Sequence, residues 1–169
     1  MEGRRLVVHM DCRGALGSPW CSAKVRIEVP RRFAAIAHAT DGHLSVARLD
    51  GPVTAKTGDG GIEVDRLGAP ARLSNRDGSI TVRDQRSGVV TAQSSTGHVR
   101  VELATAPVLV QAHSGDGDAD VAIPRGKGSV SVTVTAPNGT ASSEVRSDPA
   151  SKAIVEASSA NGDATVTYR

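Results

Sequence analysis

Aromatic side chains are scarce in this chain of 169 residues, which contains one Trp, one Tyr and one Phe. Aromatic rings normally supply much of the buried surface of a globular core. The core must therefore be aliphatic and thin, which argues against an ordinary globular enzyme. Runs with Leu at the three- and four-residue spacing of an amphipathic helix are also missing, so we expect almost no helix.

Long apolar runs and concentrated positive charge are missing as well. No apolar stretch approaches the roughly 20 residues that span a bilayer, and residues 1–24 lack the uninterrupted apolar core of a signal peptide. We therefore expect no membrane insertion by this chain itself. The net charge is +2 and the basic residues are scattered, whereas nucleic-acid binding needs a concentrated basic face. The sequence thus predicts no nucleic-acid partner.

What the chain does have is a repeat. Seven glycines, each preceded by Asp, Asn or Thr, recur at intervals that lengthen from 18 to 23 residues. Gly accepts positive φ without steric conflict and Asx side chains cap their own turns, so each pair predicts a tight structural turn. Repeats of this length are supersecondary units that become stable by stacking on their neighbours. The turn glycines are Gly42, Gly60, Gly78, Gly97, Gly117, Gly139 and Gly162.

Alternating apolar positions flank every turn and predict two half-buried strands in each repeat. The strand before the turn has apolar residues seven and five positions before the turn glycine, and the strand after the turn has apolar residues two and four positions after this glycine. Ser143 breaks the last series, in the copy around Gly139. The other residues four positions after the glycine form a predicted core ladder of valines: Val46, Val64, Val82, Val101, Val121 and Val166.

Like residues at equivalent positions are what vertical stacking requires. We therefore predict an all-β fold, a single-domain parallel β-solenoid (β-helix) of about seven coils, with residues 33–169 as the repeat region. A meander of antiparallel hairpins is the alternative, because Asx-Gly pairs also form hairpin turns. The segment 124–128 interrupts the pattern, so the later copies form either a widened coil or a terminal cap, with Tyr168 in the last strand covering that end.

Residues 1–32 are predicted to form an N-terminal strand pair and cap. The two strands are residues 6–10 and 25–29, and the loop between them contains the cysteines, Cys12 and Cys21. A disulfide between them would tie the first end of the stack. Free thiols, or a metal site with His9 and Asp11, remain open alternatives.

Several polar groups invite a chemical interpretation that the pattern does not support. Asp116, Asp118 and Asp120 alternate as in calcium-binding β-rolls, but the positions an EF-hand would fill with Gly and Glu hold other residues. Histidines share repeat positions without being adjacent: His38 with His113, and His43 with His98. No Gly-x-Ser-x-Gly motif occurs. Paired carboxylates such as Asp163 with Glu156 could line a sugar-binding groove, but β-helices that cleave polysaccharides usually have more coils and aromatic platforms, which this sequence lacks. We therefore predict no catalytic residue, no cofactor and no metal.

Three segments of the repeat resemble a known family. They are Thr57-Gly-Asp-Gly-Gly-Ile-Glu-Val64, Ser114-Gly-Asp-Gly-Asp-Ala-Asp-Val121 and Ser159-Ala-Asn-Gly-Asp-Ala-Thr-Val166. Together with the array from about Val25 to Arg169, they are similar to the bacterial adhesin family of β-strand-repeat proteins, domain of unknown function 4097. The resemblance implies a non-catalytic β-helical domain displayed on the extracytoplasmic face of a bacterial cell envelope behind a transmembrane anchor. We expect this chain to depart from that pattern, because none of the apolar stretches in this sequence is long enough for such an anchor.

Three functions follow as hypotheses. The first is a non-enzymatic scaffold or binding surface of the envelope, with another protein or a glycan as its partner. The second is a structural protein that self-assembles into filaments through its coil ends, where strand edges are exposed. The third is a polysaccharide-active β-helix enzyme.

Overall fold

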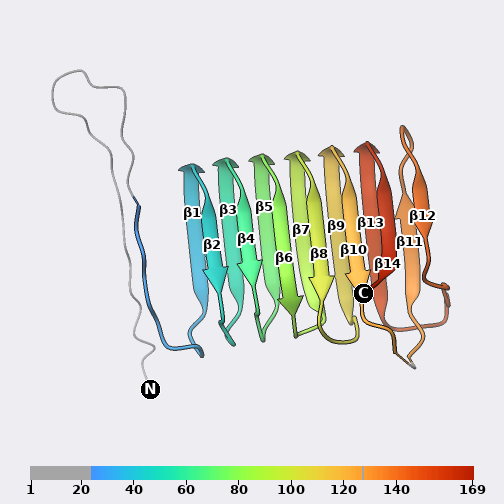
Figure 1. Cartoon of the computed structure of the whole chain (residues 1–169), viewed down its shortest axis with the longest axis horizontal. Coiled ribbons are helices and arrows are strands. Elements are labelled where there is room, and N and C mark those ends of the chain that lie inside the picture. Colours follow the sequence, from blue (N-terminus) through green and yellow to red (C-terminus); the bar gives the residue numbers. More distant parts are fainter. Residues whose placement is uncertain (1–23, 127) are drawn as a thin grey trace.

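The structure is a computed structural model that describes residues 24–126 and 128–169. Every regular element in these residues is a strand, and each repeat contributes two strands joined by an Asx-Gly or Thr-Gly turn (Figure 1). The strands are β1 (Ala35–Asp41), β2 (Leu44–Ala47), β3 (Val53–Asp59), β4 (Ile62–Asp65), β5 (Ala71–Asp77), β6 (Ile80–Gln85), β7 (Val89–Thr96), β8 (Val99–Leu103), β9 (Leu109–Asp116), β10 (Ala119–Ile123), β11 (Ser131–Thr135), β12 (Ala141–Ser143), β13 (Ile154–Asn161) and β14 (Ala164–Tyr168).

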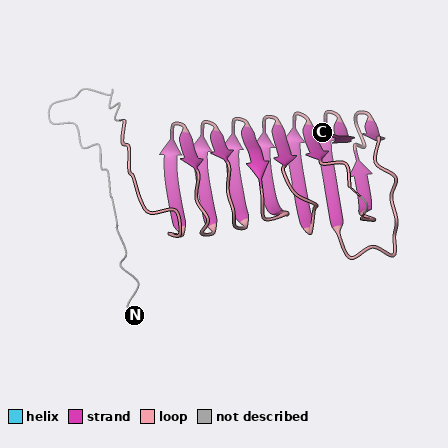
Figure 2. Ribbon diagram, turned by 60° about the horizontal axis from the view of Figure 1, so that its bottom comes forward, coloured by secondary structure: helices cyan, strands magenta, loops and turns pink. Residues whose placement is uncertain are grey.

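The strands form two parallel sheets of seven strands each. Sheet A has the order β1-β3-β5-β7-β9-β13-β11, and sheet B has the order β2-β4-β6-β8-β10-β14-β12. Figure 2 shows the two sheets as facing layers whose strands run in opposite directions. The first strand of each repeat enters sheet A and the second enters sheet B. The prediction of a parallel β-solenoid is therefore confirmed, and the hairpin meander is excluded.

The core consists of aliphatic columns that run along the stack between the two sheets. Val64, Val82, Val101, Val121 and Val166 are in register on successive strands of sheet B and are at most 1% exposed. Opposite them, sheet A contributes a column of Val and Ala that includes Val53, Ala71, Val90, Val110 and Val155. Burial of these side chains on both sides of each coil supplies the main driving force for stacking.

The turn glycines form a column of closely packed backbone. Gly42, Gly60, Gly78, Gly97, Gly117 and Gly162 all have positive φ, whereas Gly139 is not among the residues with positive φ. A Cβ on Gly97 would lie 2.2 Å from the carbonyl oxygen of Gly78 in the coil below. Both the backbone conformation and the distance between coils therefore require glycine at this position.

The coils do not stack in the order of the sequence. The last repeat, β13 and β14, lies between the coil of β9 and β10 and the coil of β11 and β12. The copy around Gly139 is therefore the terminal coil, which corrects the expectation that Tyr168 lies in the end coil. A physical reason is visible in β12, whose three residues are all exposed and include Ser143 in place of valine. The coil of β13 and β14, which has apolar residues in the columns of both sheets, therefore lies between two neighbouring coils.

The first coil is less well covered than the coils that follow it. Ala35, Leu44 and Val46 are half-buried, although their equivalents in the next coils are buried. No strand is formed over residues 24–34, so the predicted strand 25–29 is wrong: its alternating pattern has no strand to pair with among the described residues. Val29 packs against the core. The predicted strand 6–10, Cys12 and Cys21 lie outside the described residues.

Candidate functional site

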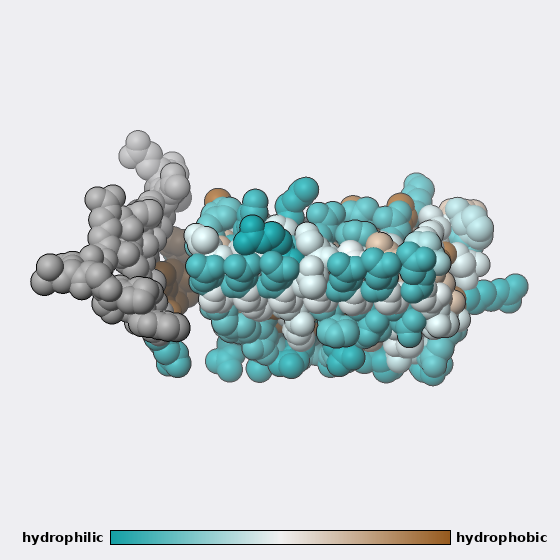
Figure 3. Space-filling view, turned by 90° about the horizontal axis from the view of Figure 1, so that it is seen from above, coloured by the Kyte–Doolittle hydropathy of each residue, from teal (hydrophilic) through white to brown (hydrophobic). Residues whose placement is uncertain are grey.

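The functional surface of a two-sheet solenoid lies on its outer faces, because side chains alternate between the core and the solvent along each strand. Equivalent outward side chains line up from coil to coil. Figure 3 views the molecule from the edge formed by the turns and shows hydrophilic side chains in rows along the stack. We consider the outer face of sheet B, the turn edge and the outer face of sheet A in turn.

The outer face of sheet B carries charges of both signs that pair across neighbouring strands. Arg83 Nη1 contacts Glu63 Oε1, and Arg100 Nη2 lies 3.3 Å from Asp120 Oδ2. A shallow groove of about 520 Å³ over β6, β8 and β10 contains His98 and the Arg100–Asp120 pair. Arg83 and Arg100 on this face therefore each have an acidic partner on a neighbouring strand. Exposed pairs of this kind contribute little to stability.

The turn edge carries stacked carboxylates. Asp41, Asp59 and Asp77 are in register on successive strands. The guanidinium of Arg76 donates to Asp59 Oδ1 at 3.1 Å and lies 3.4 Å from Asp77 Oδ2. The hydrogen bond from Arg76 lowers the pKa of Asp59 below its usual value of 3.8, and the same contact raises the pKa of Arg76. Arg76 therefore relieves the repulsion within this column.

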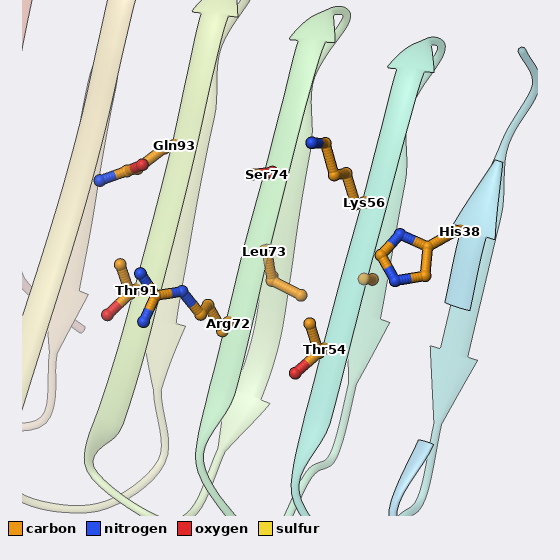
Figure 4. A pocket seen from close by; sticks show the side chains of 9 residues that line it. His38, Thr54, Lys56, Arg72, Leu73, Ser74, Thr91 and Gln93 are labelled. Carbon is orange, nitrogen blue, oxygen red and sulfur yellow. The ribbon is translucent and has the colours of Figure 1, made fainter. Parts of the chain in front are cut away.

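The outer face of sheet A differs in its charge pattern, because away from the turn edge it carries two cations without an acidic partner among the described residues. Lys56 on β3 and Arg72 on β5 make no ion pair with a described residue, and both are exposed. Figure 4 shows them with His38, Thr54 and other polar side chains around a shallow depression of about 160 Å³. This half of the sheet A face therefore combines free positive charge with hydroxyl and amide groups.

The other half of the sheet A face has side chains that bond to one another. Gln111 Nε2 donates to Glu156 Oε2 at 2.8 Å, and His113 Nδ1 lies 2.8 Å from Ser158 Oγ. These contacts join β9 to β13. The sheet A face is therefore polarised along the stack, with unpaired cations over β3 and β5 and a partnered carboxylate over β13.

The alternating aspartates of the fifth coil use their carboxylates to hold the next coil. Asp116 Oδ1 accepts from Asn161 Nδ2 at 2.6 Å, and Asp118 Oδ1 accepts from the backbone N–H of Asp163 at 2.9 Å. Asp120 accepts from a threonine hydroxyl of β14. Within residues 24–126 and 128–169, no group of three or more His, Cys, Asp or Glu side chains is arranged to hold a metal ion.

The histidine and carboxylate pairs considered from the sequence are not brought together. His38 lies on β1 and His113 on β9, with three strands between them, and His43 and His98 are separated by two coils. Glu156 points outward from β13, whereas Asp163 follows the turn beyond Asn161. Glu156 and Asn161 are five residue steps apart along β13, which is about 16 Å. The turn that leads to Asp163 is therefore further from Glu156 than the roughly 5–9.5 Å between the two carboxylates of a glycosidase.

A buried polar column was missed by the sequence reasoning. Small polar residues three positions before the turn glycine point inward and donate to a glycine carbonyl of the coil below; Ser114 Oγ, for example, lies 2.7 Å from Gly97 O. Their constant position, three residues before the turn glycine, was the sequence signal that could have predicted this column. The hydrogen bonds satisfy backbone acceptors at the turn. The members are Thr57, Asn75, Ser94, Ser114 and Ser159.

At the opposite corner of the coils, Gln85 occupies a position that is a buried leucine in other coils, namely Leu49, Leu67 and Leu103. It is fully buried in register with Leu103, and its Nε2 donates to the carbonyl of Ala69 at 2.7 Å. The side-chain oxygen of Gln85 has no hydrogen-bond partner in the described structure. Strand alternation alone does not place Gln85 in the core, because a bulge shifts the register between Val82 and Gln85. The repeat spacing does indicate it, since Gln85 lies seven residues after its turn glycine, as the buried Leu49 and Leu67 do.

Comparisons with protein-family models, with curated proteins and with solved structures find no match to this chain. The described residues contain no helix long and apolar enough to cross a membrane. What the fold defines is a class of architecture, a two-sheet parallel β-solenoid with polar outer faces. The resemblance to the adhesin family stays a prediction.

Proposed function

We propose that this chain is a non-enzymatic binding module of the bacterial cell envelope. The observation that carries the proposal is the in-register arrangement of polar side chains on flat outer faces, above all the unpaired Lys56 and Arg72 on sheet A. A stack of coils in register holds such side chains at a regular spacing, which reduces the entropy lost when an extended partner binds. The envelope location rests on the family resemblance.

The binding role is tested with the purified full chain on arrays of bacterial and host glycans and on envelope proteins. Saturable binding to one partner class, lost on heat unfolding of the protein, is the expected result. Turnover of a polysaccharide, abolished by substitution of Glu156, would instead favour an enzyme. The envelope location is tested by fractionating cells that express the gene from its native start, and recovery in the cytoplasm alone would contradict it.

A filament-forming protein is the second candidate, and the first coil favours it. Ala35, Leu44 and Val46 are half-buried there, and among the described strands β1 and β2 are the end strands of their sheets. Free edges and uncovered apolar columns promote end-to-end association. Light scattering and negative-stain images over a range of protein concentrations test this candidate. Filaments that lengthen with concentration would support it, and a monomer at all concentrations would reject it.

A further inference from the structure

The two outer faces of the solenoid differ in a way that points to a ligand. On sheet B, Arg83 and Arg100 are each paired with a carboxylate. On sheet A, Lys56 and Arg72 make no ion pair with any residue in the described ranges 24–126 and 128–169. We propose that the outer face of sheet A over β1, β3, β5 and β7 binds a linear acidic polysaccharide. This inference rests on the proposed binding function and names the partner and the surface.

The geometry of the face suits a long ligand that crosses the strands. His38, Lys56, Ser74 and Gln93 occupy one row, because each is in register with the next on neighbouring strands. A second row holds Thr54, Arg72 and Thr91, also in register. Neighbouring strands lie about 4.8 Å apart, so each row offers a polar contact at every such step. An acidic polymer that crosses the strands can therefore place one acidic group near Lys56 and another near Arg72, and meets neutral polar side chains at the other steps.

The chemistry of these rows matches a charged sugar chain. Lys56 and Arg72 supply cations for carboxylate or sulfate groups, and Arg72 can donate two hydrogen bonds to one carboxylate. Thr54, Thr91 and Gln93 supply donors and acceptors for sugar hydroxyls. The depression that these residues line is about 160 Å³, smaller than the roughly 300–1,000 Å³ of small-molecule pockets. The surface therefore suits an extended ligand better than a compact one.

Other classes of partner fit this face less well. Extended peptides usually add to a sheet edge and not to a sheet face. Single-stranded nucleic acids use aromatic side chains for base stacking, and the described lining residues include no Phe, Tyr or Trp. Anionic membranes are recognised by clusters of about four to eight Lys or Arg residues, whereas Lys56 and Arg72 are two. These partners remain as outcomes of the test.

The test compares two variants with the same change in charge on opposite faces. The sheet A variant is Lys56→Gln with Arg72→Gln, and the matched control is Arg83→Gln with Arg100→Gln on sheet B. All four side chains are exposed, so both variants should fold, as checked by circular dichroism. The probe is a galacturonate oligomer titrated calorimetrically at low and high salt. A neutral galactan oligomer, single-stranded DNA and vesicles of anionic lipid serve as comparison probes.

We expect the galacturonate oligomer to bind the wild-type chain and to bind the sheet A variant about tenfold or more weakly, with the sheet B variant within about twofold of wild type. Equal losses in both variants, or tighter binding of DNA or vesicles, would overturn the inference. The inference would also be overturned if the wild-type chain bound none of the acidic probes, that is, the galacturonate oligomer, the DNA and the anionic vesicles. Binding of neutral glycans that neither variant weakens would overturn the acidic polysaccharide while leaving the proposed binding function intact.

Discussion

Replacing one turn glycine by alanine separates the two reasons why glycine is needed there. Gly97 has a φ of +128°, and a Cβ at this position would lie 2.2 Å from Gly78 O. The backbone strain costs about 1–3 kcal/mol. Forcing the two coils apart adds a further cost of about 1–3 kcal/mol, as for other overpacked sites. We therefore expect Gly97→Ala to lower the free energy of unfolding by about 2–6 kcal/mol.

Gly42 provides the matched control for this substitution. Its φ is +110°, but a Cβ there would meet no atom within 4 Å. Gly42→Ala should therefore show the strain alone, about 1–3 kcal/mol. The assay is urea unfolding followed by far-ultraviolet circular dichroism, with the midpoint and slope fitted for each variant. Loss of stability in Gly97→Ala no greater than in Gly42→Ala would refute close packing of the glycine column.

Two further predictions concern the core and the turn edge. Val82 is fully buried, so Val82→Asp should place an unpaired charge in the core and abolish folding. Arg100→Ser removes one exposed ion pair and should change the free energy of unfolding by less than about 1 kcal/mol. Similar unfolding curves for the two variants would contradict the assignment of Val82 to the core and Arg100 to the outer face. Arg76 holds the pKa of Asp59 below 3.8, so this pair stabilises the fold above the usual carboxyl pKa and loses that effect as the pH falls through the lowered pKa. Arg76→Gln should raise the pKa of Asp59 in a carboxyl NMR titration, and an unchanged pKa would show that the contact is absent in solution.

The architecture was predictable because every repeat contains the same sequence pattern of a turn followed by a half-buried strand. Asp59-Gly60 followed by Ile62 and Val64 specifies a turn and a half-buried strand, and the same pattern one coil later specifies its neighbour. The periodicity within a repeat does not, however, determine the order in which the coils stack, because several coils have the same spacing of apolar residues. The place of Ser143 in a valine column was the sequence signal that this copy is the terminal one.

The candidate site was predictable only in part, for a related reason. Alternation placed Lys56 and Arg72 outside the core, but their lack of acidic partners depends on which strands are neighbours. Arg100 and Asp120 are twenty residues apart in the chain and become a pair because β8 and β10 are adjacent. Charge pairing is thus a property of the stack and not of the single repeat.

The position of the last coil gives the most direct test of the account. In a background with both native cysteines replaced by serine, Gln111→Cys is combined with Glu156→Cys or with Thr133→Cys. Residues 111 and 156 are in register on neighbouring strands, whereas residue 133 lies one strand further on, at about 10 Å from residue 111. A disulfide needs Cα atoms within about 7 Å.

Oxidation followed by mass spectrometry of the non-reduced peptides measures which pair forms. We expect the 111–156 disulfide to form readily and the 111–133 disulfide to be absent. Coils stacked in the order of the sequence would place 133 beside 111 and reverse this result, which would contradict the structure described for the end of the solenoid.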